Sequence, residues 1–342
     1  MQSEPVTTTN PSNPPAPGYR PGDSGAAGEG SSAGSAASVP TERAAGWAGK
    51  LGILARDIKL SHTVFALPFA VLGMVLAAGW AGRRVSGVEA GLVVGCMVLA
   101  RTFAMSVNRV ADAALDAANP RTAGRAVASG ALSRRFAGGV IAATGAGFML
   151  GTAGFWWAAG NRWPFVLAGP VLAVLAGYSF AKRFTWWCHV VLGLALGLSP
   201  LAAAVAIEPG YLAGSAAGWW LAGMVLCWVA GFDVIYALQD VGVDRKLGLF
   251  SMPASLGEER ALWVSRGLHA GAAGCLAGAW WVSPQLGTWF GLALGGVAGL
   301  LVVEHALVWR SEARRIPLAF FTVNGVISLL LGAAGVADVY AG

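Results

Sequence analysis

Long apolar runs, repeated along most of the sequence, set the kind of fold that this chain can adopt. Each run is roughly 20 residues long, the length that a helix needs to cross the hydrocarbon core of a bilayer. Only 12% of the residues are charged, against about 25% in an ordinary soluble domain. The runs lie near residues 60–80, 88–107, 136–158, 163–181, 186–207, 217–240, 261–282, 286–308 and 317–340. The sequence therefore predicts an all-α, polytopic membrane bundle of nine transmembrane helices.

The region before the first run has a different composition. Residues 1–45 are rich in Pro, Gly, Ser and Ala and have little apolar surface to bury, so we expect a disordered N-terminal tail. We expect no signal peptide within it, because acidic residues interrupt the stretch where an apolar core would lie. The remainder, residues 50–342, is predicted to be one membrane domain.

Basic residues in the loops indicate the orientation of the bundle. With the N-terminus in the cytoplasm, the inner loops carry twelve lysines and arginines and the outer loops carry three, as the positive-inside rule requires. The twelve are Arg121, Arg125, Arg134, Arg135, Lys182, Arg183, Arg245, Lys246, Arg260, Arg310, Arg314 and Arg315, and the three are Arg83, Arg84 and Arg162. We expect a multi-pass protein of the bacterial inner or plasma membrane, with its N-terminus cytoplasmic.

Tryptophan gives an independent indication of the same arrangement. Nine tryptophans fall at predicted outer ends of the runs, where the indole ring favours the headgroup layer. They are Trp80, Trp156, Trp157, Trp163, Trp219, Trp220, Trp280, Trp281 and Trp289. We interpret them as interfacial residues. The four histidines and four cysteines are scattered along the chain, and we interpret them as packing or interfacial residues as well.

Polar residues recur at intervals of four at the predicted inner end of the second helix. The segment NRVADAALDAANPRTAGR contains Asn108, Asp112 and Asp116, and residues four apart share one face of a helix. A single acidic pair of this kind is explained well enough by solvated loop charges that pair with nearby arginines.

A second set, however, occurs at the inner end of the sixth helix, in FDVIYALQDVGVDRKLG. Asp240 and Asp244 are four apart, and Asp233 and Tyr236 share their stripe. Each acid of this second pair follows its counterpart in the first pair by 128 residues along the sequence, since 240 − 112 and 244 − 116 both equal 128. Four helices separate the two copies, so both are predicted to end at the same membrane face.

Two acidic pairs at one membrane face need a positive partner, because like charges repel and charge near hydrocarbon is costly. Hard carboxylate oxygens indicate Mg²⁺, which usually combines one or two carboxylates with phosphate oxygens. Basic residues are predicted on the same side, namely Arg109, Arg121, Arg125, Lys182 and Arg183. Acids, bases and an apolar interior together indicate a site for a diphosphate attached to a lipid.

At these residues the chain resembles the UbiA superfamily of intramembrane aromatic prenyltransferases. The family pattern combines Asn-x-x-x-Asp-x-x-x-Asp with a later Asp-x-x-Tyr-x-x-x-Asp-x-x-x-Asp within nine helices. A third matching stretch is YSFAKRFTWW at 178–187, and the resemblance runs from about residue 50 to the end. Many members have Asp directly after the first Asn. Arg109 at that position is typical of the 4-hydroxybenzoate polyprenyltransferase branch.

The resemblance implies Mg²⁺-dependent transfer of a polyprenyl group from polyprenyl diphosphate to a ring carbon of an aromatic acid, in ubiquinone or menaquinone biosynthesis. The implied metal ligands are Asp112, Asp116, Asp240 and Asp244. The residues implied to bind the diphosphate are Lys182, Arg125, Arg121 and Asn108, the last also close to the metal. Asp233 would orient the phenol of the acceptor or receive its proton, and Tyr178 and Tyr236 would flank the reacting carbon.

Two alternatives stay open at this stage. Residues 58–73, IKLSHTVFALPFAVLG, look like the futalosine-route menaquinone enzymes, whose acceptor is 1,4-dihydroxy-6-naphthoate. Lys59 and Arg56 are candidates for binding the carboxylate of either acceptor. From another class, a cation-coupled transporter would also use carboxylates within the membrane, but near its middle and beside broken helices. We expect no nucleic-acid partner.

Overall fold

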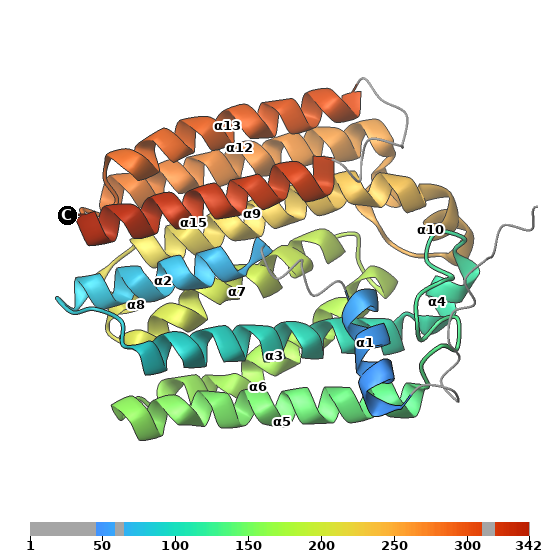
Figure 1. Cartoon of the computed structure of the whole chain (residues 1–342). Helices are drawn as coiled ribbons and strands as arrows, with labels where there is room; N and C mark the ends of the chain where they lie inside the picture. Colours follow the sequence, from blue (N-terminus) through green and yellow to red (C-terminus); the bar gives the residue numbers. More distant parts are fainter. Residues whose placement is uncertain (1–45, 59–64, 310–318, 342) are drawn as a thin grey trace, which may run out of the picture. The chain divides into compact units, whose positions relative to one another are not determined.

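The computed structural model describes residues 46–58, 65–309 and 319–341. These residues form helices and no strand, which confirms the predicted all-α class (Figure 1). The elements are α1 (Trp47–Asp57), α2 (Leu67–Trp80), α3 (Gly87–Ala111), α4 (Ala113–Ala118), α5 (Arg134–Ala159), α6 (Trp163–Gly177), η2 (Tyr178–Arg183), α7 (Cys188–Ile207), α8 (Tyr211–Gly214), α9 (Ala217–Ala237), η3 (Leu238–Asp240), α10 (Val241–Leu247), α11 (Met252–Leu256), α12 (Glu258–Val282), α13 (Thr288–Trp309), η5 (Ala319–Val323) and α15 (Asn324–Ala341). The predicted tail, Lys59, Arg310, Arg314 and Arg315 lie outside the described residues.

Within the described residues, seven helical segments are long and apolar enough to cross a membrane, so the chain is a multi-pass membrane protein. The prediction of nine spans is not confirmed. α2 has only 14 residues, and the first part of the predicted run 60–80 lies outside the described ranges. α12 has 25 residues, but Arg266 and His269 within it lower its apolar character. Both helices nevertheless pack lengthwise among the other seven (Figure 1).

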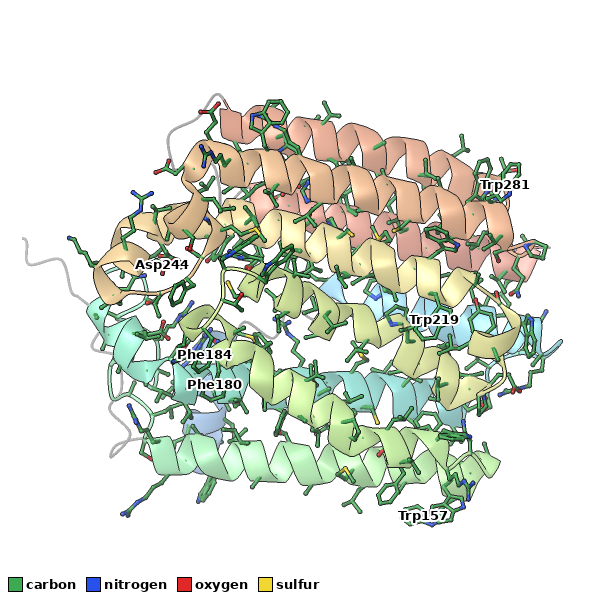
Figure 2. The ribbon with its side chains drawn as sticks, turned by 180° about the vertical axis from the view of Figure 1, so that it is seen from behind. Trp157, Phe180, Phe184, Trp219, Asp244 and Trp281 are labelled. Carbon is green, nitrogen blue, oxygen red and sulfur yellow. The ribbon has the colours of Figure 1, made fainter. Side chains whose placement is uncertain are left out.

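The two ends of the bundle differ in chemistry. Trp157, Trp219 and Trp281 lie at one end, and Asp244 and Phe180 lie at the opposite end, which we call the acidic end (Figure 2). All nine tryptophans that were predicted to be interfacial are exposed, the least exposed of them at 42%. The short helices α4 and α10 lie together at the acidic end, whereas α8 lies at the other (Figure 1). The compartment that each end faces stays a prediction.

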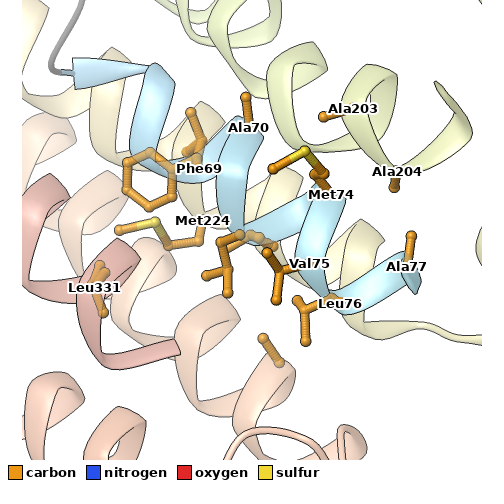
Figure 3. Close-up of a cluster of buried hydrophobic side chains, with 14 of the residues drawn as sticks. Phe69, Ala70, Met74, Val75, Leu76, Ala77, Ala203, Ala204, Met224 and Leu331 are labelled. Carbon is orange, nitrogen blue, oxygen red and sulfur yellow. The ribbon is translucent and has the colours of Figure 1, made fainter. Parts of the chain in front are cut away.

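The short helix α2 is buried among longer ones. Its side chains are apolar all round, as expected of a helix in the centre of a bundle. Figure 3 shows Phe69 and Met74 of α2 among side chains that include Met224 of α9 and Leu331 of α15, and Phe69 is fully buried. Because lipid is as apolar as these side chains, close packing rather than removal from water holds α2 in place.

α7 and α9 approach each other closely at Gly193. A Cβ atom at this position would overlap the carbonyl oxygen of Leu226 and crowd the backbone nitrogen of Ala230, both on α9. One turn further along, Gly197 meets the backbone of Ala222 in the same way. Small residues are the usual means by which membrane helices come this close. The contact sets the separation between α7 and α9, and α9 carries the predicted site residues Asp233 and Tyr236.

Three helices change their geometry at the acidic end. α3 ends at Ala111, and Asp112 separates it from α4, which carries Asp116. α6 continues as the 3₁₀ helix η2, and α9 continues through the 3₁₀ segment η3 into α10, which carries Asp244. The acidic motifs therefore do not lie on continuous α-helices, as their spacing had led us to expect. Each motif instead spans a helix break and places its last aspartate on a short second helix.

Candidate active site

A cavity of about 220 Å³ lies at the acidic end, between the helix breaks. All eleven site residues expected from the sequence line it. They are Asn108, Asp112, Asp116, Arg121, Arg125, Tyr178, Lys182, Asp233, Tyr236, Asp240 and Asp244. The two acidic motifs, 128 residues apart in the sequence, thus face one space, together with residues of η2 and α7. Their chemical roles are not tested by this arrangement and stay predictions.

The aspartates of the first motif are paired with bases. Asp112 is 1% exposed and accepts hydrogen bonds from Lys182 Nζ at 2.7 Å and from Arg183 Nη2 at 3.0 Å. Asp116 Oδ1 accepts a hydrogen bond from Arg125 Nη1 at 2.7 Å. Lys182 and Arg183 belong to η2, so the break after α6 delivers two positive charges to the break after α3. This pairing offsets the repulsion between acids on neighbouring turns.

Asp240 of the second motif is held by residues that follow the first motif. Asn119 Nδ2 donates to Asp240 Oδ1 at 2.8 Å, and Arg121 forms an ion pair with the same carboxylate. The guanidinium of Arg121 also lies over the ring of Tyr236 and donates to its hydroxyl at 2.8 Å. Burial opposes the charge of Arg121, but its hydrogen bond to Asp240 and the nearby oxygens outweigh that cost and raise its pKa. Arg121 thus bridges the two motifs as a permanent cation.

The donor set around the cavity suits Mg²⁺. Among the described residues, no three His, Cys, Asp or Glu side chains are grouped closely enough to hold a metal by themselves. Mg²⁺ does not need such a cage, because it usually takes one or two carboxylates and completes its shell with water and phosphate oxygens. The available oxygens are hard carboxylates, and Asp116 Oδ2 is buried without a hydrogen-bond partner in the described part of the chain. That orphan oxygen fits a metal ligand, since a buried acceptor is otherwise costly.

Arg109 does not face the cavity, contrary to its grouping with the basic residues of the site. It is 5% exposed and points to α1, where its Nε donates to Asp57 Oδ2 at 2.8 Å. Its Nη1 donates to Asn108 Oδ1 at 3.0 Å, and Asn108 Nδ2 in turn donates to Asp112. Asp57 Oδ1 also accepts from the backbone N–H of Ala126. Arg109 therefore ties α1 to the first motif, because a buried guanidinium requires a carboxylate partner.

One functional contact lies at a residue that sequence reasoning interpreted as packing. His189, at the start of α7, lines the cavity, and its Nδ1 is 2.7 Å from Asp233 Oδ2. No local spacing could reveal this pair, because 44 residues separate its members. Of the two candidates for binding an acceptor carboxylate, Arg56 is exposed on α1 and does not line the cavity. The other, Lys59, lies outside the described ranges.

Comparisons with known proteins agree with this geometry. Residues 66–326 match the model of the UbiA prenyltransferase family. A 4-hydroxybenzoate octaprenyltransferase from Paracidovorax citrulli is 34% identical over 218 residues, which cover 62% of this chain and 68% of that protein. The apo structure of a UbiA homolog from Aeropyrum pernix is 31% identical, with a TM-score of 0.72 over 82% of this chain and 98% of that one.

A more distant structure has the same fold. A UbiA homolog from Archaeoglobus fulgidus, bound to DMAPP and Mg²⁺, has a TM-score of 0.65 at 19% identity and covers 84% of this chain and 99% of its own. The family model accounts for most of the membrane domain, and the two acidic motifs and η2 all fall within its limits. The chain belongs to the UbiA prenyltransferase family and is a prenyltransferase.

Proposed function

We propose that this prenyltransferase moves a polyprenyl group from polyprenyl diphosphate to a ring carbon of an aromatic acid of the 4-hydroxybenzoate type, in quinone biosynthesis. The observation that carries the proposal is the meeting of both acidic motifs and three bases around one cavity. The relative named 4-hydroxybenzoate octaprenyltransferase supports the choice of acceptor. We place this site on the cytoplasmic side, in accord with the distribution of basic residues.

The diphosphate end of the site is formed by three acid–base pairs. The pairs are Asp112 with Lys182, Asp116 with Arg125, and Asp240 with Arg121. We propose that these bases turn to the diphosphate oxygens when substrate arrives, and that the released aspartates, with Asp244 and Asn108, hold Mg²⁺. When bound, the metal neutralises the charge that grows on the leaving diphosphate. The bases add hydrogen bonds to the same oxygens, and these strengthen as the negative charge develops.

The acceptor end of the site lies around Asp233. As the allylic C–O bond breaks, its electron pair leaves with the diphosphate, and a ring carbon ortho to the phenol hydroxyl attacks the resulting cation. Asp233, with its side chain 25% exposed, is placed in our proposal to orient that hydroxyl and to accept the released proton. The rings of Tyr178 and Tyr236 line the same cavity and can stabilise the allylic cation through their faces. An apolar surround limits capture of the cation by water.

Replacing Asp233 with asparagine should impair the acceptor step selectively. We expect kcat/KM for the aromatic acid to fall about 100-fold or more, because the amide cannot accept a proton. The KM for prenyl diphosphate should change by less than about twofold, since among the described residues Asp233 is hydrogen-bonded to His189 and not to Lys182, Arg121 or Arg125. Initial rates at varied concentrations of each substrate test this prediction. Glu208→Gln, an acid at the tryptophan end, is the control. Unchanged kinetics in Asp233→Asn would reject the role.

A competition assay tests the choice of acceptor. Purified protein in liposomes is given Mg²⁺, one prenyl diphosphate and equal amounts of 4-hydroxybenzoate and 1,4-dihydroxy-6-naphthoate. We expect diphosphate release in step with prenylated 4-hydroxybenzoate. Preferential prenylation of the naphthoate would assign the second acceptor, which the sequence of residues 58–73 left open. Membership of a prenyltransferase family favours an enzyme over the cation-coupled transporter. In the same liposomes, movement of substrate across the membrane without release of diphosphate would contradict the proposal.

A further inference from the structure

We infer that His189 is a positioning residue that fixes the carboxylate of Asp233 for the acceptor. The inference rests on the acceptor role proposed for Asp233. His189 is 3% exposed, and its two ring nitrogens have different partners. Nδ1 lies 2.7 Å from Asp233 Oδ2, and Nε2 accepts a hydrogen bond from the backbone N–H of Met252 at 3.2 Å. One imidazole therefore joins α9 to Met252, the first residue of α11.

The Met252 contact decides which nitrogen of His189 carries the proton. A backbone N–H can only donate, so Nε2 must present its lone pair to Met252. Neutral imidazole carries one N–H, which then lies on Nδ1 and points at Asp233 Oδ2. A doubly protonated ring would set two N–H groups against each other at Nε2. The geometry thus assigns His189 an Nδ1–H that donates to Asp233 Oδ2 and an Nε2 that accepts from Met252.

This N–H lies where the loop of residues 248–251 enters α11, and that loop is itself held in place. The Met252 side chain is fully buried and packs with Val234 of α9 and Ala261 of α12. Phe250 N donates to the carbonyl oxygen of Lys182 at 2.8 Å, and Ser251 Oγ donates to Asp244 Oδ2 at 2.7 Å. The donor that fixes the tautomer of His189 cannot turn away without breaking these contacts. The same loop therefore links the acceptor end of the cavity to its diphosphate end.

The hydrogen bond from His189 has a directional consequence. It occupies Asp233 Oδ2 and fixes the plane of the carboxylate. In the described residues no hydrogen bond reaches Asp233 Oδ1, so Oδ1 is available to the phenol hydroxyl. His189 is not a proton relay, because its Nε2 has no free position from which to pass a proton on. It acts through Asp233, as a ligand-orienting partner does at a metal or catalytic site.

Two substitutions at His189 separate orientation from simple packing. Glutamine keeps one donor for Asp233 and one acceptor for Met252, whereas leucine fills the space and offers neither. We expect His189→Leu to lower kcat/KM for the aromatic acid about 10- to 100-fold, with the KM for prenyl diphosphate unchanged. His189→Gln should recover most of that loss. The matched control is His269→Leu, which removes a histidine that is equally buried but lies outside the cavity, and it should leave acceptor kinetics intact.

A double variant gives the decisive comparison. If His189 acts through Asp233, then Asp233→Asn combined with His189→Leu should lose no more acceptor kcat/KM than Asp233→Asn alone, since coupled residues are not additive. The inference would be overturned if the losses of the two single variants multiplied in the double variant. It would also be overturned if His189→Gln and His189→Leu raised the KM of both substrates equally. If Asp233→Asn is impaired but His189→Leu is normal, the inference about His189 is overturned and the proposed role of Asp233 stands. Normal kinetics in Asp233→Asn would overturn the proposed role of Asp233 and this inference with it.

Discussion

Replacing Asp240 with alanine should abolish prenyl transfer while leaving the folded protein in the membrane. Asp240 is the carboxylate at which the two motifs meet, through Asn119 and Arg121. Its loss removes a proposed metal ligand and releases Arg121 from its place over Tyr236. We expect kcat to fall by about 10³-fold or more, which corresponds to roughly 4 kcal/mol of transition-state stabilisation. Diphosphate release from liposomes measures the effect.

The choice of Asp240 over Asp112 follows from burial. Asp112 is buried and holds Lys182, Arg183 and Asn108, so its removal would break three polar contacts at once and destabilise the fold. Asp240 and Arg121 are partly exposed, and water can solvate the remaining guanidinium. The control is Glu89→Gln, which alters another partly exposed acid–base pair, with Arg83, at the tryptophan end of the bundle. Normal turnover in Asp240→Ala would remove this residue from the metal shell.

Chelation of divalent cations by EDTA should stop turnover completely, and added Mg²⁺ should restore it. Without the cation the aspartates retain their bases, so these bases are not available to the diphosphate oxygens. A second measurement avoids reliance on activity. Prenyl diphosphate with Mg²⁺ should raise the thermal stability of the wild-type protein, because a ligand that binds only the folded state stabilises it. Neither addition alone should do so, and Asp240→Ala should show a weaker shift. Full turnover in EDTA would refute the metal requirement.

The sequence predicted the fold class and the site members because both depend on local patterns. Apolar runs of bilayer length indicate membrane helices whatever their neighbours are. The repeats that contain Asp112 and Asp240 indicate matched depth, because each occurs where an apolar run ends. For that reason the two motifs face one cavity even though the helices break there, together with residues such as Lys182 and Tyr178 that only the family resemblance indicated. The membrane side that this cavity faces depends on loop charges and stays a prediction.

The remaining features depend on contacts between distant segments. The partner of Arg109 is Asp57, on a helix that crosses the bundle, and that of His189 is Asp233, two helices later. The members of each pair are too far apart along the chain for a periodic pattern in the sequence to indicate their contact. The count of nine spans is not confirmed, for a different reason. α2 is short because tight packing, not lipid, surrounds it, and α12 tolerates polar residues because His269 has partners inside the bundle. Hydropathy alone does not report either condition.

The backbone contact at Gly193 bears on how this enzyme can diversify. Gly193 lies one turn from His189, and Ala230, which it touches, lies one turn from Asp233. Two main chains in contact at this point cannot move closer, and separating them would open a gap in the bundle. If the acceptor is the aromatic acid that we propose, a lineage that changes the size of its ring must therefore exchange the side chains that line the pocket, while the helix axes stay where they are.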